Sequence, residues 1–157
     1  MYNVTEAIAA PQIQNWRGFA PRPPRPPTIA PIARMKLHAS VTTGLMSITA
    51  YDAGFIAVNG RPLTRSFLLT PRHLIEDWAP ESFEALAESD FSAIANLGAP
   101  IVLLGTGARQ RFPAPGLLRP LLARRVGVEV MDTHAACRTY NILMAEGRDV
   151  AAALLIA

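Results

Sequence analysis

The stretch from Gly127 to Arg148 decides the fold and reads GVEVMDTHAACRTYNILMAEGR. Together with Val126, its first residues form a short apolar and β-branched run, which is typical of a strand covered on both faces. The hydrophobic period then changes to that of a helix, and Gly147 predicts a left-handed C-cap. The chain continues at once into another short apolar run, Asp149 to Ala157. Strand, helix and strand with tight joints predict a βαβ unit with a right-handed crossover.

The sequence also predicts how this helix begins and which face it buries. Asp132 and Thr133 end the strand, and the side-chain oxygen of either residue is suited to accept from a free N–H group of the first helical turn. At about 100° per residue, one face of the helix should be buried and the other exposed. The predicted buried face holds Ala136, Tyr140, Leu143 and Met144, and the opposite face holds His134, Arg138, Asn141 and Ala145.

A β-meander is predicted ahead of this unit, from Ser47 to Thr70. Asp52-Ala53-Gly54 marks its first turn, and Asn59-Gly60 is a strong hairpin signal for its second. The third strand is predicted to run from Leu63 to Thr70 and to end at Pro71, because proline has no N–H group for a sheet.

Between the meander and the βαβ unit, strands and helices alternate. A helix with Ser89 as its N-cap is predicted to stop at Gly98. Ile101 to Leu104 is a continuous apolar run and predicts a buried parallel strand. The other expected elements are a short strand at His73 to Trp78, one or two short helices within Pro80 to Leu97, a short edge piece at Gln110 to Phe112 and a helix from Pro115 to Arg124. The predicted fold class is α/β, a single three-layer domain with a mixed central sheet.

Residues 1–34 differ in composition from the rest of the chain. They hold seven of the 14 prolines, a density that predicts a disordered or polyproline-like tail. They also hold four arginines and one glutamate, which account for the whole net charge of +3. The predicted domain, residues 35–157, has 11 basic and 11 acidic residues and so lacks the basic excess of a nucleic-acid-binding surface. Nucleic-acid binding through the tail is a weaker alternative.

Composition restricts the class of protein further. Cys137 is the single cysteine, which excludes an internal disulfide and suggests a reducing compartment. No secretory signal is visible, and no apolar run approaches the roughly 20 residues of a transmembrane helix. We therefore expect a cytoplasmic protein without a membrane span. The three histidines have no ligand spacing, so we expect neither a metal site nor a cofactor.

A glycine-rich turn is the first candidate for a ligand site. Gly105-Thr106-Gly107 follows the predicted parallel strand, at the position where α/β sheets bind ligands. It is neither GxGxxG nor a P-loop, so a tight turn that needs glycine is favoured and a phosphate cradle is the alternative. Asp132 and Thr133 lie at the same edge if the two strands are parallel. For Asp132, helix capping is favoured over general-base catalysis.

Other polar residues have similar pairs of interpretations. Arg109, Arg111 and Arg138 could line an anion pocket with this turn, but a scattered, solvated set is favoured. Cys137 is predicted to be a buried or half-buried helix residue, since no partner base for a nucleophile is identified. Tyr140 is predicted to pack its ring and to form a hydrogen bond through its hydroxyl group.

Three segments together resemble a known family. They are Ile101–Gly107 (IVLLGTG), Val126–Thr133 (VGVEVMDT), and Ala136–Leu143 with Glu146–Arg148 after it. The pattern is similar to the Mth-type domain-of-unknown-function family, which includes the adipogenesis-associated Mth-domain protein and a mitochondrial assembly factor for respiratory complex I. The resemblance covers about residues 35–157, and it implies a compact three-layer α/β domain with no established enzyme activity.

The resemblance also implies a function. We expect a non-enzymatic protein that works with protein partners, namely respiratory complex I subunits or assembly factors, peripheral to the inner membrane and mitochondrial in a eukaryote. The alternative is a small-molecule or anion-binding protein, or an enzyme, that uses the edge formed by Gly105–Gly107 and Asp132–Thr133. The motif residues expected to form a family surface are Gly105, Thr106, Gly107, Asp132, Thr133, Arg138, Thr139, Tyr140 and Asn141.

Overall fold

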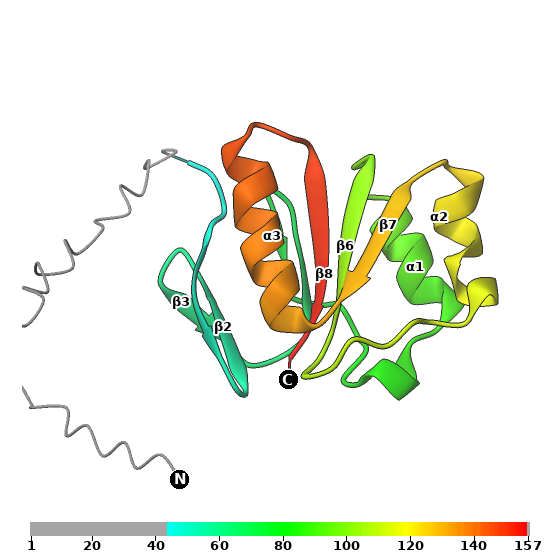
Figure 1. Cartoon of the computed structure of the whole chain (residues 1–157), viewed down its shortest axis with the longest axis horizontal. Coiled ribbons are helices and arrows are strands. Elements are labelled where there is room, and N and C mark those ends of the chain that lie inside the picture. Colours follow the sequence, from blue (N-terminus) through cyan, green and yellow to red (C-terminus); the bar gives the residue numbers. More distant parts are fainter. Residues whose placement is uncertain (1–43, 157) are drawn as a thin grey trace, which may run out of the picture. The chain divides into compact units, whose positions relative to one another are not determined.

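Figure 1 shows the chain as a computed structural model, which describes residues 44–156. The predicted tail and its boundary at residue 34 lie outside the described residues. The described part contains eight strands, three α-helices (α) and two 3₁₀ helices (η). In chain order these are β1 (Ile48–Asp52), β2 (Phe55–Val58), β3 (Arg61–Leu63), β4 (Phe67–Leu69), β5 (Leu74–Ile75), η1 (Phe83–Ala85), α1 (Glu88–Ala95), β6 (Ile101–Thr106), η2 (Pro115–Leu118), α2 (Arg119–Ala123), β7 (Gly127–Met131), α3 (Thr133–Ala145) and β8 (Val150–Leu155).

The strands form two sheets. A small antiparallel sheet has the order β1-β2-β3, and a large sheet has the order β5-β4-β8-β6-β7. In the large sheet, β6 pairs in parallel with both β7 and β8, whereas β4 pairs antiparallel with β8 and with β5. The predicted mixed central sheet and the C-terminal strand–helix–strand unit are therefore confirmed.

The central strand β8 separates two hydrophobic cores. Its side chains at positions 150, 152 and 154 pack into a core with α3 and the small sheet, and those at 151, 153 and 155 pack into a core with α1 and α2. All six are at most 1% exposed. This two-sided burial explains why β8 is a continuous apolar run rather than an alternating one. Figure 1 shows α3 on one side of the sheet and α1 and α2 on the other, so the predicted three layers are confirmed.

The predicted third strand of the meander is wrong in one respect. Leu63 to Thr70 is not one strand, because β3 ends at Leu63 and stays in the small sheet while β4 pairs with β8 in the large one. The chain changes sheets across residues 64–66. Phe67, Leu68 and Leu69 are each at most 2% exposed, because β4 lies between the two cores. A run buried on both faces belongs inside a covered sheet, which the small sheet is not.

The strand that opens the deciding stretch also differs from its prediction. β7 is the edge strand of the large sheet, not a strand covered on both faces. Gly127 and Glu129 are exposed, whereas Val128 and Val130 are half-buried and pack against the core of α1 and α2. The β-branched residues of β7 therefore pack on one face only, and they alternate with the exposed Gly127 and Glu129.

Two local predictions for the chain between β5 and β7 are wrong. The N-cap of α1 is Ala87 rather than Ser89, and the Asp90 carboxylate accepts from the Ala87 N–H at 2.8 Å. An acidic residue three positions after the cap serves the same role as in a capping box. Gln110 to Phe112 forms no strand. Instead, the Gln110 side-chain amide donates to the Val130 carbonyl at 2.8 Å and so covers part of the β7 edge.

The helix predicted from Pro115 to Arg124 is present only in part. It consists of the 3₁₀ helix η2 followed by the five-residue helix α2. Pro120 lacks an N–H group, so it cannot donate the hydrogen bond that would join the two segments. Leu121 is fully buried, but Leu122 is 60% exposed.

The helix α3 is predicted more closely. Asp132 is its N-cap, and its carboxylate accepts from the Ala135 N–H at 2.8 Å. Gly147 follows the helix with φ +75°, which is the left-handed conformation of a C-cap. Cys137 joins the predicted buried face, while His134 and Asn141 are half-buried because the small sheet covers that side.

Candidate functional site

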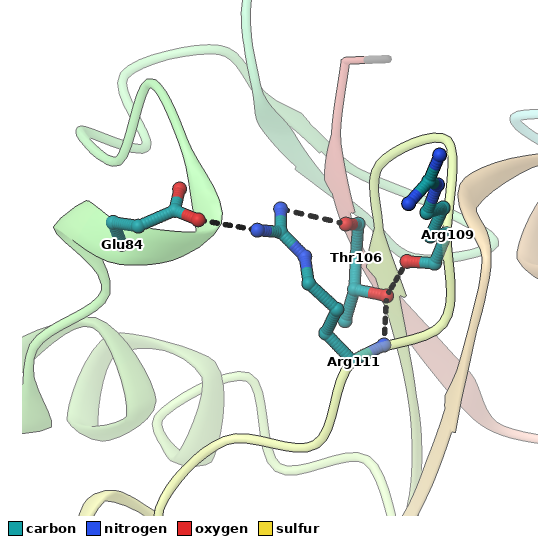
Figure 2. Close-up of polar contacts among 4 residues, drawn as sticks. All are labelled: Glu84, Thr106, Arg109 and Arg111. Carbon is teal, nitrogen blue, oxygen red and sulfur yellow. Dashed lines mark hydrogen bonds and ion pairs between the residues drawn. The ribbon is translucent and has the colours of Figure 1, made fainter.

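The turn after β6 is closed by the hydroxyl group of Thr106, as Figure 2 shows. This oxygen accepts from the Arg111 N–H at 3.0 Å and lies 2.8 Å from the Arg109 carbonyl and 3.0 Å from the Met131 carbonyl. Thr106 is 0% exposed. One buried side chain therefore holds both the returning loop and the end of β7.

Thr133 makes the complementary contacts at the start of α3. Its hydroxyl group accepts from the Gly107 N–H at 2.8 Å and donates to the Leu155 carbonyl at 2.7 Å. Its own N–H donates to the Gly107 carbonyl at 2.9 Å. The ends of β6 and β8 and the start of α3 are thus joined through one residue that is 1% exposed.

The two glycines of the turn have separate structural reasons. A Cβ atom on Gly105 would lie 2.9 Å from Leu154 Cδ2 and 3.1 Å from Thr133 Cα, so glycine allows α3 to approach β6 closely. Gly107 has φ +89°, a conformation that L side chains rarely adopt. A bound phosphate would need free N–H groups here, and the Gly107 N–H is already paired with Thr133.

The three arginines considered for an anion pocket contact different parts of the chain. Arg111 forms an ion pair with Glu84 and lies over the Phe83 ring, with 4.3 Å from its guanidinium carbon to the ring centroid. Arg138 instead donates to the Tyr51 hydroxyl at 3.4 Å. Arg109 is exposed, and its carbonyl group serves the turn. The scattered arrangement that the sequence favoured is the one the structure has.

Two further motif residues on α3 bind the chain at the start of β1 and just before it. Asn141 brackets Ile48, since its Oδ1 accepts from the Ile48 N–H at 3.0 Å and its Nδ2 donates to the Ile48 carbonyl at 2.7 Å. The Tyr140 hydroxyl donates to the Met46 carbonyl at 2.8 Å, which confirms the predicted hydrogen bond through this group. Thr139 is half-buried. These contacts could not be predicted from the sequence, because the partners lie more than 90 residues apart.

Burial sets the ionisation of two groups on α3. It raises the pKa of the Cys137 thiol to about 12, and it also raises the pKa of the Tyr140 hydroxyl. A thiol that stays protonated at neutral pH is a poor nucleophile. On the same helix, the imidazole of His134 stacks at a tilt on Tyr51 with 4.9 Å between ring centroids, and its buried Nε2 has no hydrogen-bond partner in the described part of the chain.

A shallow apolar hollow lies beside the Arg111–Glu84 ion pair and was missed by the sequence reasoning. It has a volume of about 350 Å³ and is lined by Phe83, Glu84, Leu86, Arg111, Pro113, Ala114 and Leu117. The pKa of Glu84 lies below its ordinary value, first because of a hydrogen bond to its own backbone and then because of Arg111. The carboxylate is therefore ionised at neutral pH, and the ion pair persists there. The sequence signal that could have pointed to this surface is the stretch from Gly105 to Val128, which contains five arginines and no acidic residue.

Residues 44–156 contain neither a metal site nor a membrane-spanning helix. No group of three or more histidine, cysteine, aspartate or glutamate side chains is arranged to hold a metal ion. None of the helices is long and apolar enough to cross a membrane.

Comparisons with known proteins agree with this fold. Residues 48–155 match the family described as proteins of unknown function, DUF498/DUF598. A bovine (Bos taurus) protein, NADH dehydrogenase [ubiquinone] 1 alpha subcomplex assembly factor 3, is 36% identical over 112 residues. That alignment covers 70% of this chain and 60% of the bovine protein, so the chain matches less than two thirds of the relative's length.

Two solved structures from Bordetella are similar over most of their lengths. A crystal structure of a Bordetella parapertussis protein has a TM-score of 0.70 and 43% identity, covering 74% of this chain and 99% of that one. A solution structure of a Bordetella pertussis protein, a Mth938-like domain, has a TM-score of 0.68 and 37% identity, covering 78% and 92% of the two chains. The chain therefore belongs to the DUF498/DUF598 family and has the Mth938-like fold.

Proposed function

We propose that this chain is a non-enzymatic binding protein that supports the assembly of respiratory complex I. The observation that carries the proposal is its 36% identity, over 112 residues, to a protein named as an assembly factor for NADH dehydrogenase. The family match, residues 48–155, spans nearly all of the described residues, so the likeness concerns the folded body and not a short motif.

The contacts of the motif residues support this proposal over ligand chemistry at the strand ends. In α/β sheets, ligands bind outside the carboxyl ends of the parallel strands. Here the Gly107 N–H donates to the Thr133 hydroxyl group, which itself donates to the Leu155 carbonyl. The Thr106 hydroxyl group contacts the Met131 carbonyl. Asp132 caps α3, and Asn141 holds β1. These residues stabilise the fold, which leaves its outer surface for recognition.

The partners that we propose are complex I subunits or other assembly factors, met at the inner membrane. An assembly factor binds an incomplete complex and is released from the finished one. Its essential property is therefore a stable folded surface, which a three-layer domain with two cores provides.

Deleting the gene and measuring assembled complex I tests the proposal. Native gels of the membranes, stained for NADH dehydrogenase activity, should show less complex I while an unrelated respiratory complex stays unchanged. Wild-type chain supplied from a plasmid should restore the lost complex. Complex I that is equally abundant with and without the gene contradicts the proposed function.

A further inference from the structure

The positive charge of the folded body is concentrated in one segment. From Gly105 to Val128 the sequence contains five arginines and no acidic residue. Because residues 35–157 are neutral as a whole, this concentration is hidden in the overall charge. The arginine segment, as we call residues 109–125, holds Arg109, Arg111, Arg119, Arg124 and Arg125.

Most of this charge is not neutralised within the described residues. Arg111 makes the segment's single ion pair there, with Glu84. Arg124 donates to neutral acceptors, the Ala95 carbonyl at 2.8 Å and the Asn96 side-chain oxygen at 2.9 Å. The guanidinium groups of Arg109, Arg119 and Arg125 make no hydrogen bond to any residue of 44–156, and all three residues are exposed. A surface of this kind attracts carboxylates.

The apolar hollow beside this segment has a fixed wall. The guanidinium group of Arg111 is held by Glu84 on one side and by the Thr106 carbonyl, at 3.4 Å, on the other, as Figure 2 shows. It also lies over Phe83, which itself lines the hollow. Leu86, Pro113 and Leu117 supply the rest of the apolar lining. A side chain that enters such a hollow loses little to rearrangement of the protein.

Two large apolar residues of the arginine segment are exposed. Phe112 directly precedes the lining residue Pro113 and is 72% exposed. Leu122, later in the arginine segment, is 60% exposed. Aromatic and arginine side chains are the residues enriched at protein–protein interfaces and among their energetic hot spots.

We infer that this hollow binds an apolar side chain from an acidic segment of a partner protein, with carboxylates of that segment paired to Arg109 and Arg119. Arg109 and Arg119 are each two residues from a lining residue, Arg111 and Leu117 respectively. The unneutralised positive charge selects an acidic partner. The concave apolar lining selects a protruding side chain, which the flat surface of an anionic membrane does not offer. The inference rests on the proposed function, because it identifies the surface and the partner chemistry that this function needs.

Site-specific photo-crosslinking in the native host tests the inference on the full chain. Phe112 is replaced by p-benzoylphenylalanine, which preserves the aromatic ring at an exposed position. After irradiation, mass spectrometry identifies the crosslinked peptide. The expected product is a segment of another protein that carries several Asp or Glu residues around a Leu, Ile, Met or Phe.

Three variants in the same background refine the test. Arg109→Gln with Arg119→Gln removes two exposed charges, and Ala114→Trp fills the hollow from an exposed lining position. Arg72→Gln with Arg148→Gln is the matched control, since both of these arginines are exposed and lie outside the arginine segment. A synthetic peptide with the crosslinked sequence should bind the first variant about fivefold more weakly, at roughly twofold to threefold per exposed charge pair. Ala114→Trp should weaken binding at least about tenfold, and the control should leave it unchanged.

Several outcomes overturn the inference. These are a crosslink to a phospholipid, to a second copy of this chain or to a segment without carboxylates, and the absence of any crosslink in the folded protein. Equal weakening by the control pair also overturns it. Failure of the inference is distinguishable from failure of the proposed function, because the gene deletion would still lower complex I in the first case and would leave it unchanged in the second.

Discussion

Replacing Thr133 by valine removes the hydroxyl group that joins three segments while preserving the shape of the side chain. The buried Gly107 N–H, now 2.8 Å from the hydroxyl oxygen, loses its acceptor. The Leu155 carbonyl, at 2.7 Å, loses its donor. The substitution therefore tests whether the turn after β6 is a structural connection, as its contacts indicate.

The expected loss of stability follows from these two bonds. A buried polar group left without a partner costs about 1–3 kcal/mol, and the carbonyl has a second lone pair that other donors can use. We therefore expect Thr133→Val to lower the free energy of unfolding by about 2–4 kcal/mol. Thr133→Ser keeps the hydroxyl group and loses one buried methyl group, which costs about 1 kcal/mol. The informative result is the order of the two free energies of unfolding. The valine variant should be less stable than the serine variant, although valine is the more hydrophobic residue.

Urea unfolding of the full chain, followed by far-UV circular dichroism, measures both variants. The midpoint should fall in the order wild type, serine, valine, with an unchanged dependence of the free energy on urea concentration. A valine variant as stable as the serine variant would refute the reasoning, because the hydroxyl group would then contribute no net stability to the joint.

Further predictions concern three other residues, Gly105, Asn141 and Cys137. Gly105→Ala should lower the free energy of unfolding by about 1–3 kcal/mol in the same urea assay, because the added Cβ would lie 2.9 Å from Leu154 Cδ2, and an unchanged midpoint would contradict the close packing. Asn141→Ala should speed hydrogen exchange at the Ile48 N–H and lower the free energy of unfolding by about 2–4 kcal/mol, because both hydrogen bonds to Ile48 are lost. Thr139→Ala is the control and should have little effect, and equal effects of the two substitutions would contradict the role of Asn141. The Cys137 thiol should resist alkylation at about pH 8 in the folded chain and react fully in urea, because burial raises its pKa to about 12, and rapid native labelling would show that it is accessible. As the unfolded thiol ionises first, near its ordinary pKa of 9.0, this group should also make stability fall as pH rises from about 9 to 12.

The elements with the strongest periodicity were the ones that the sequence predicted best. α3 has both a capping residue and a C-cap glycine at its ends, so local chemistry determines where it begins and stops. β8 is buried on both faces and is correspondingly apolar throughout. For such segments, local preference and tertiary burial agree.

The errors arose where tertiary pairing decides the structure. Leu63 to Thr70 reads as one strand, and nothing in its local pattern shows that β3 and β4 pair in different sheets. β7 has β-branched residues but lies at an edge, because strand order depends on how the remote segment β8 inserts beside β6. Strand order is a long-range property that hydrophobic periodicity does not encode.

The contacts of the candidate site residues could not be predicted from the sequence. The motif residues from Gly105 to Asn141 were identified, yet their hydrogen bonds to Leu155, Ile48 and Met46 could not be derived from spacing. The apolar hollow near Arg111 was missed because Phe83 and Leu117, which line it together, belong to separate elements. The charge of the arginine segment was visible in the sequence but was averaged away in the net charge.

The most direct test of the account follows the chain itself through native gels of solubilised membranes. Tagged chain, extracted in mild detergent, should migrate with partly assembled complex I, identified by the subunits present in the same gel slice, and should be absent from the mature complex. Chain that migrates only at its own mass, under conditions in which assembly intermediates are detected, would contradict the proposal that it acts as an assembly factor.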